Sequence, residues 1–137
     1  MQNLKEYVSN FIPDKQDRIK SADEIGKKLY KDNWNTLIDS LAQIDNSLAE
    51  LVKEIPYGTI YPREKLSLDY REIAAITSLT QLNLKPQLKS HIIAALNVGL
   101  SKDQLVELFL HLSQFIGFPL ILDGLRVAKD VFDHYQL

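Results

Sequence analysis

The fold is decided by the stretch KPQLKSHIIAALNVGLSKDQ, residues 85–104. Pro86 suits the first turn of a helix, and a helix over residues 87–97 would end at the glycine that follows it. Ser101 and Gln104 have the spacing of a capping box, which predicts the start of another helix. Two helices are therefore expected to meet in a tight hairpin.

Helical spacing of apolar residues continues on the N-terminal side of this hairpin. Residues 15–31 carry one narrow apolar stripe. A stronger pattern over residues 34–55 is interrupted near Asp45, whose side chain could cap a second helix. An irregular connection is expected over residues 61–68, with Asp69 as the cap of the helix that follows.

The remaining breaks come from glycine and proline. Pro56 and Gly58 are expected to end the second region. Apolar residues over 105–116 predict a helix that stops at Gly117, and a last helix is expected over 120–134. The sequence therefore predicts an all-α fold of about six or seven helices around a central helical hairpin. We expect residues 1–33 to form an N-terminal helical arm that packs across a neighbouring copy, and residues 34–137 to form the main helical domain.

Composition excludes several classes of function. The 137 residues are 45% apolar, and 16 basic against 18 acidic side chains give a net charge of −2. Without a basic stripe, nucleic acid is not an expected partner. Without a long apolar run, neither a membrane span nor a signal peptide is expected, so the predicted location is the cytoplasm. The absence of cysteine rules out disulfides, thiolate nucleophiles and cysteine-bound metals.

A few polar residues are candidates for chemistry. Glu107 and His111 share a helix face, and we interpret them as a solvated pair. His91 lies in a weakly polar helix, where a histidine is more often a hydrogen-bonded core residue than a catalyst. Glu72 could pair with its neighbour or with solvent, and Arg63 could be an ordinary surface side chain or could hold a carboxylate. The three histidines lack metal-ligand spacing, so no metal and no cofactor is expected.

Five motifs together resemble the carboxymuconolactone decarboxylase-like family, whose members have the AhpD-like fold. The resemblance covers about residues 45–132 and rests on segments in the same order and at compatible spacing. They are REKL at 63–66, DYREIA at 69–74, HIIAALNVG at 91–99, QLVE at 104–107 and FIGFP at 115–119.

The family has two chemical branches. In its thiol peroxidases, a glutamate is followed by a Cys-x-x-Cys pair and then by a histidine. Counted from Glu72, the cysteine positions fall on Leu84 and Gln87, and the histidine position falls on His91. Peroxide reduction through a thiolate therefore has no nucleophile in this chain.

The decarboxylase branch resembles this chain in lacking those cysteines. By that resemblance, His91 would be the proton donor, Glu72 would orient it, and Arg63 would bind a carboxylate of a small lactone-like substrate. Phe115 and Ile116 stand where the decarboxylases commonly have tyrosine and cysteine. Lys65 stands where a glycine is usual after the Arg63 region.

The resemblance implies a homo-oligomer, a hexamer or a trimer, acting on a small-molecule substrate. The expected activity is that of a lyase or proton-transfer enzyme. A non-catalytic assembly protein, in which Glu72 and His91 only satisfy each other, is the alternative. A pocket that holds Arg63, Glu72 and His91 together would favour the enzyme.

Overall fold

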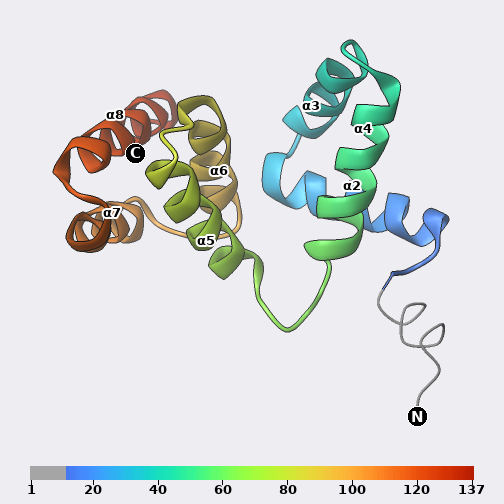
Figure 1. Ribbon diagram of the computed structural model, residues 1–137, viewed down its shortest axis with the longest axis horizontal. Coiled ribbons are helices and arrows are strands. Elements are labelled where there is room, and N and C mark those ends of the chain that lie inside the picture. Colours follow the sequence, from blue (N-terminus) through green and yellow to red (C-terminus); the bar gives the residue numbers. More distant parts are fainter. Residues whose placement is uncertain (1–11) are drawn as a thin grey trace. The chain divides into compact units, whose positions relative to one another are not determined.

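A computed structural model describes residues 12–137, and every regular element in that range is helical (Figure 1). Internal contacts divide the chain into two units, residues 1–65 and 66–137. The part of the chain that the structure describes holds seven α-helices and one π-helix. None of these helices is both long and apolar enough to cross a membrane. The predicted all-α class is therefore confirmed.

The first unit is built from helices packed in pairs. Its elements are α2 (Lys15–Tyr30), α3 (Asn33–Ala42), α4 (Asn46–Val52) and the π-helix η1 (Lys53–Ile60). α2 packs along η1, and α3 packs along α4. Asp45 caps α4 as predicted, because its Oδ1 accepts from the backbone N–H groups of Ser47 and Leu48 at 2.7 and 3.1 Å.

Aromatic side chains fill the interior of this unit. The Trp34 ring is buried, with its centroid 4.9 Å from that of Tyr57. The hydroxyl oxygens of Tyr30 and Tyr57 lie 2.8 Å apart and share a hydrogen bond. Gly26 makes room for the indole, since a Cβ atom there would lie 2.1 Å from Trp34. Gly26 and Tyr30 of α2 therefore pack against aromatic rings of α3 and η1.

The helix at residues 53–60 corrects one expectation. Pro56 was expected to end the helical region, but the chain continues through it as a π-helix to Ile60. The proline ring crowds a carbonyl of the preceding turn in an α-helix, and the wider turn of a π-helix leaves more room for it. The backbone N–H of Tyr61 donates to the Pro56 carbonyl at 2.8 Å, and the Thr59 hydroxyl donates to the Glu54 carbonyl at 2.7 Å.

The described part of the predicted arm packs within its own unit, because α2 packs on η1 of the same chain, and the packing of the arm on a neighbouring copy stays a prediction. An ion pair of 2.7 Å between Arg18 and Glu54 joins the two helices, and Lys15 lies 3.2 Å from the same carboxylate. Residues 1–11 of the predicted arm lie outside the described residues. The boundary after residue 33 stays a prediction.

The second unit contains the larger aliphatic core. Its helices are α5 (Leu68–Gln81), α6 (Lys85–Asn97), α7 (Lys102–Ile116) and α8 (Phe118–Tyr135). α5 packs on α6, α7 packs on α8, and α6 also contacts α8. The core residues Ile76, Ile92, Phe109 and Ile121 are almost completely buried. These contacts hold α5 and α6 side by side, which sets the register of their polar residues.

Helix ends in this unit mostly follow the sequence signals. The capping box of α7 is present, with Gln104 N–H donating to the Ser101 hydroxyl at 3.1 Å and Ser101 N–H donating to the Gln104 amide oxygen at 2.8 Å. The predicted cap of α5 is wrong by two residues, because Ser67 precedes the helix and Asp69 lies in its first turn. A carboxylate in the first turn still interacts favourably with the helix dipole.

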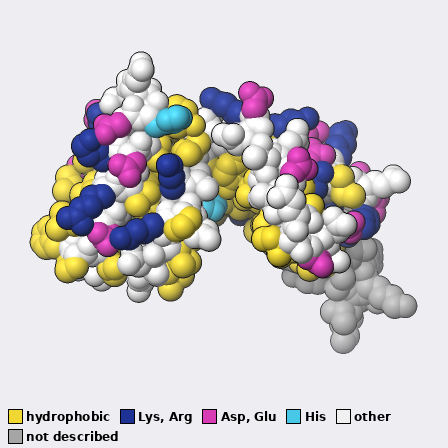
Figure 2. All heavy atoms as spheres, turned by 90° about the horizontal axis from the view of Figure 1, so that it is seen from above, with side chains coloured by type: hydrophobic (Ala, Val, Ile, Leu, Met, Phe, Trp, Pro, Cys, Tyr) yellow, Lys and Arg dark blue, Asp and Glu magenta, His cyan; other side chains and the backbone are white. Residues whose placement is uncertain are grey.

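Charged side chains are spread over both units. On the face drawn in Figure 2, basic and acidic groups are interspersed, and neither unit shows a surface of one sign in that view.

Candidate functional site

Glu72 and His91 lie on the paired helices α5 and α6. Glu72 is one turn before the core residue Ile76, and His91 is next to Ile92, which belongs to the same core. Residues four apart share a helix face, so burial of Ile76 directs Glu72 toward the interior. Apolar packing of α5 on α6 therefore positions two polar groups nineteen residues apart.

The predicted hydrogen bond between these residues is present. Nδ1 of His91 lies 2.7 Å from Oε2 of Glu72. The Glu72 side chain is fully buried, whereas 19% of the His91 side chain is exposed. A buried carboxylate is costly unless it is paired, and no buried side-chain nitrogen or oxygen within residues 12–137 lacks a hydrogen-bond partner.

This geometry determines what the imidazole ring can do. With the carboxylate accepting from the Nδ1 proton, Nε2 is the ring nitrogen that can exchange a proton with another molecule. The pair therefore has the construction of an acid–base group with a fixed orientation.

The positions that carry cysteines in the thiol peroxidases lie at the start of α6. Leu84 is the residue before the helix, and Gln87 is in its first turn. Gln87 is four residues before His91 and so shares its helix face. The histidine thus keeps its place relative to Glu72, while the positions around it are aliphatic or amide side chains.

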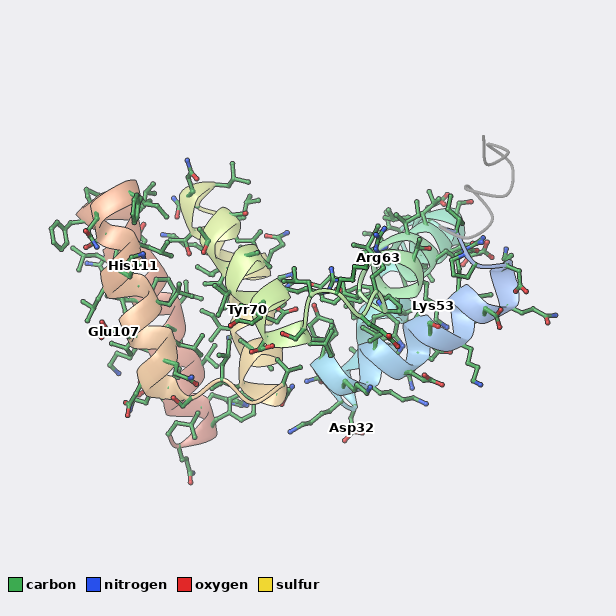
Figure 3. All side chains as sticks on the ribbon, turned by 90° about the horizontal axis from the view of Figure 1, so that it is seen from below. Asp32, Lys53, Arg63, Tyr70, Glu107 and His111 are labelled. Atoms are coloured by element: carbon green, nitrogen blue, oxygen red, sulfur yellow. The ribbon has the colours of Figure 1, made fainter. Side chains whose placement is uncertain are left out.

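Arg63 lies in the first unit, three residues after the end of η1 (Figure 3). It lines a surface hollow of about 430 Å³ together with Glu64 and Lys65. Glu72 and His91 belong to the second unit, and the part of Arg63 in a common site stays a prediction.

The other candidate pair, Glu107 and His111, lies on the surface. Glu107 and His111 are both exposed on α7 (Figure 3), and the His111 ring lies 5.4 Å from the Phe115 ring. No group of three or more histidine or carboxylate side chains that could hold a metal ion occurs in the part of the chain that the structure describes.

Lys65, which stands where the family commonly has a glycine, also borders the Arg63 hollow. Ser21 borders it too, and no sequence pattern predicted this, since Ser21 reaches the hollow only through the packing of α2 on η1.

Comparison with known proteins identifies the family of the chain. Residues 46–130 match the model of the carboxymuconolactone decarboxylase family. The chain is also similar to 4-carboxymuconolactone decarboxylase of Acinetobacter baylyi, with 28% identity over 98 residues that cover 72% of this chain and 73% of the relative. The matched region includes the whole of α5 and α6 and therefore both members of the Glu72–His91 pair. Since the family model spans more than half of its length, the chain belongs to the carboxymuconolactone decarboxylase family.

Proposed function

We propose that the chain is a lyase that removes carbon dioxide from a small carboxylated, lactone-like molecule, with His91 as the proton donor. The observation that carries the proposal is the 2.7 Å contact between His91 Nδ1 and the fully buried carboxylate of Glu72. Such a contact fixes the orientation of the ring and leaves Nε2 as the nitrogen that can transfer a proton. Family membership supports a decarboxylase-like reaction.

The proposed reaction has a simple balance of atoms and electrons. The bond between the substrate carbon and its carboxylate breaks, and carbon dioxide leaves without the bonding electron pair. That pair spreads onto a conjugated carbonyl of the substrate. The proton on Nε2 of His91 then bonds to the substrate carbon, and water returns a proton to the ring. No thiol takes part, because the chain has no cysteine.

Arg63 has a binding role in this proposal. Its planar guanidinium can hold a carboxylate with two parallel hydrogen bonds, which a lysine cannot reproduce. We expect Arg63→Lys to raise KM more than it lowers kcat. The hydrogen bonds from the guanidinium to the substrate carboxylate would be equally strong in the bound substrate and in the transition state, so their loss weakens binding more than it slows the chemical step.

The test is an assay with 4-carboxymuconolactone and a panel of related carboxylated lactones, following carbon dioxide release. His91→Gln keeps much of the side-chain volume and should spare folding, but it should lower turnover by about a hundredfold or more. His111→Gln is the matched control, since His111 is an exposed histidine of the same unit and should turn over normally.

In a non-catalytic assembly protein, the same hydrogen bond between Glu72 and His91 would serve only to satisfy two polar groups in the interior. That alternative predicts no turnover of any lactone by the wild-type protein. It also predicts that His91→Gln changes stability alone. Normal turnover by the His91→Gln variant would likewise refute the proposed mechanism.

A further inference from the structure

A groove of about 630 Å³ opens on the first unit, and its wall is mostly apolar. Four aliphatic residues from α4, from η1 and from just before α2 line it: Ile12, Leu51, Ile55 and Ile60. Each of them is between 39% and 55% exposed. The packing of α2 and α4 on η1 holds them around one hollow. Its volume and its apolar lining are those of a small-molecule binding site.

The charged groups that border the groove are already paired. The Arg18 guanidinium lies 2.7 Å from Oε2 of Glu54, and it also donates to the Pro13 carbonyl. Nζ of Lys15 lies 3.2 Å from Oε1 of Glu54 and 3.4 Å from Oε2 of Glu50. Two positive and two negative side chains therefore meet at this groove, and their charges sum to zero at neutral pH.

Two hydroxyl groups complete the polar part of the wall. Thr59 donates its hydroxyl proton to the Glu54 carbonyl at 2.7 Å, so its oxygen can only accept from a ligand. Ser47 is exposed at the start of α4 and also lines the groove, where its hydroxyl can donate or accept. These hydroxyls suit a neutral polar group of a ligand.

We propose that this groove binds a small, uncharged and largely aliphatic molecule that carries a hydroxyl or carbonyl group. The four aliphatic side chains cover its hydrocarbon part. An ionised group would lose water on entering and would find the charges of the wall already paired, so it binds less well. Binding here needs neither Glu72 nor His91, so the proposal goes beyond the lyase activity proposed above.

The experiment is an NMR titration of the full chain at pH 7 with three probes of one chain length, 1-octanol, octanoate and octylammonium. The backbone amides of residues 51, 55 and 60 report on the groove. 1-Octanol should bind at least about tenfold more tightly than either ion, because its hydroxyl costs less to desolvate than a charge. Equal or tighter binding of either ion would overturn the proposal, as would the absence of saturable binding of 1-octanol.

Leu51→Asn tests the aliphatic wall. Leu51 is exposed, so the change should leave the far-UV circular dichroism unaltered while it weakens 1-octanol binding about tenfold. Ile44→Asn is the matched control, because Ile44 is 76% exposed in the same unit and does not line the groove. An equal effect of the two variants would overturn the proposal. So would loss of binding in a Phe115→Ser/Phe118→Ser variant, which would place the alcohol on the second unit.

Glu50→Gln tests the charge balance. It leaves Lys15 and Arg18 with one carboxylate, so the groove gains a net positive charge. Octanoate should then bind about threefold more tightly and octylammonium more weakly, while 1-octanol is unaffected. Glu24→Gln should alter none of the three, because Glu24 is exposed on α2 and does not line the groove. An unchanged ratio of octanoate to 1-octanol affinity in the Glu50 variant would overturn the selectivity proposed for the groove.

Discussion

His91 Nδ1 lies 2.7 Å from Glu72 Oε2, and this contact joins α6 to α5 beside a core of aliphatic side chains. One partner is fully buried and the other is partly exposed. The buried member can therefore orient the ring without meeting solvent, while the ring keeps an open side. A pair built this way has consequences for stability and for chemistry that can be measured separately.

Replacing Glu72 with glutamine should lower both stability and turnover. The amide oxygen can still accept from Nδ1, but the negative charge is lost, so the unfolding free energy should fall by about 2 kcal/mol. Loss of an orienting carboxylate should lower kcat about ten- to a hundredfold with little change in KM. Urea denaturation and steady-state kinetics measure the two effects.

Thr80→Val is the control for a buried polar residue on the same helix. Its hydroxyl donates to the Ile76 carbonyl at 2.7 Å, so the change should cost stability and leave kcat unaltered. Equal losses of kcat in the Glu72 and Thr80 variants would show that the kinetic effect comes from general disturbance of α5.

Asp123 should make the stability of the second unit depend on pH in the acidic range. Its carboxylate accepts from Lys85 at 2.8 Å and from Arg126 at 2.8 Å, and these hydrogen bonds hold the pKa of Asp123 below its ordinary value of 3.8. Because the pKa of Asp123 is lower in the folded state than in the unfolded state, the ionised carboxylate stabilises the fold at pH values above its unfolded-state pKa. This contribution is lost as the pH falls through the folded-state pKa.

Asp123→Asn should therefore be less stable than the wild type at pH 7, with the difference shrinking below about pH 4. Urea unfolding measured from pH 2 to 7 tests this dependence. Asp130→Asn on the same helix is the comparison, and it should not reproduce the change. A stability difference that stays constant down to pH 2 would be the contrary result.

The cap that Ser101 provides for α7 should make a measurable contribution to the unfolding free energy. Ser101→Ala removes the acceptor for the Gln104 N–H and should lower the unfolding free energy by about 1 kcal/mol. Ser113→Ala lies inside the same helix, where its hydroxyl donates to the Leu110 carbonyl, and it should change stability by less than about 0.5 kcal/mol. Similar losses in both variants would argue against a specific capping effect.

The elements predicted correctly are those with local causes. Asp45 and the Ser101–Gln104 box act through backbone groups two or three residues away, so the sequence contains the whole interaction. The η1 helix was missed because proline usually ends an α-helix, and only a wider turn lets the chain continue through Pro56.

The site was predictable to a different extent at each residue. Glu72 and His91 were found through the spacing that the family resemblance supplies, and the packing of α5 on α6 then brings them into contact. Ser21 could not be found, since its place beside Lys65 depends on the close approach of two helices at Gly58. Contacts of that kind follow from tertiary packing and leave no local pattern.

Exposed apolar side chains on the second unit bear on whether the protein assembles into oligomers. The second unit exposes large apolar side chains on α7 and α8, here called the α7–α8 apolar surface: Leu110 (51% exposed), Phe115 (74%), Phe118 (66%) and Leu122 (49%). Exposed apolar side chains of this size commonly mark an interface when they lie together. We expect the protein to be a homo-oligomer, a trimer or a hexamer, that buries this surface between copies.

Light scattering at micromolar concentration should accordingly give a multiple of the 15.7 kDa chain mass. The double variant Phe115→Ser/Phe118→Ser should shift the mass toward that of a single chain while the far-UV circular dichroism stays helical. Ile44→Ser is the control, because Ile44 is 76% exposed in the first unit and lies outside the α7–α8 apolar surface. A wild-type protein that scatters as a monomer would exclude assembly. Dissociation by Ile44→Ser alone would place the interface on the first unit, because the side chains that stabilise it would then lie there.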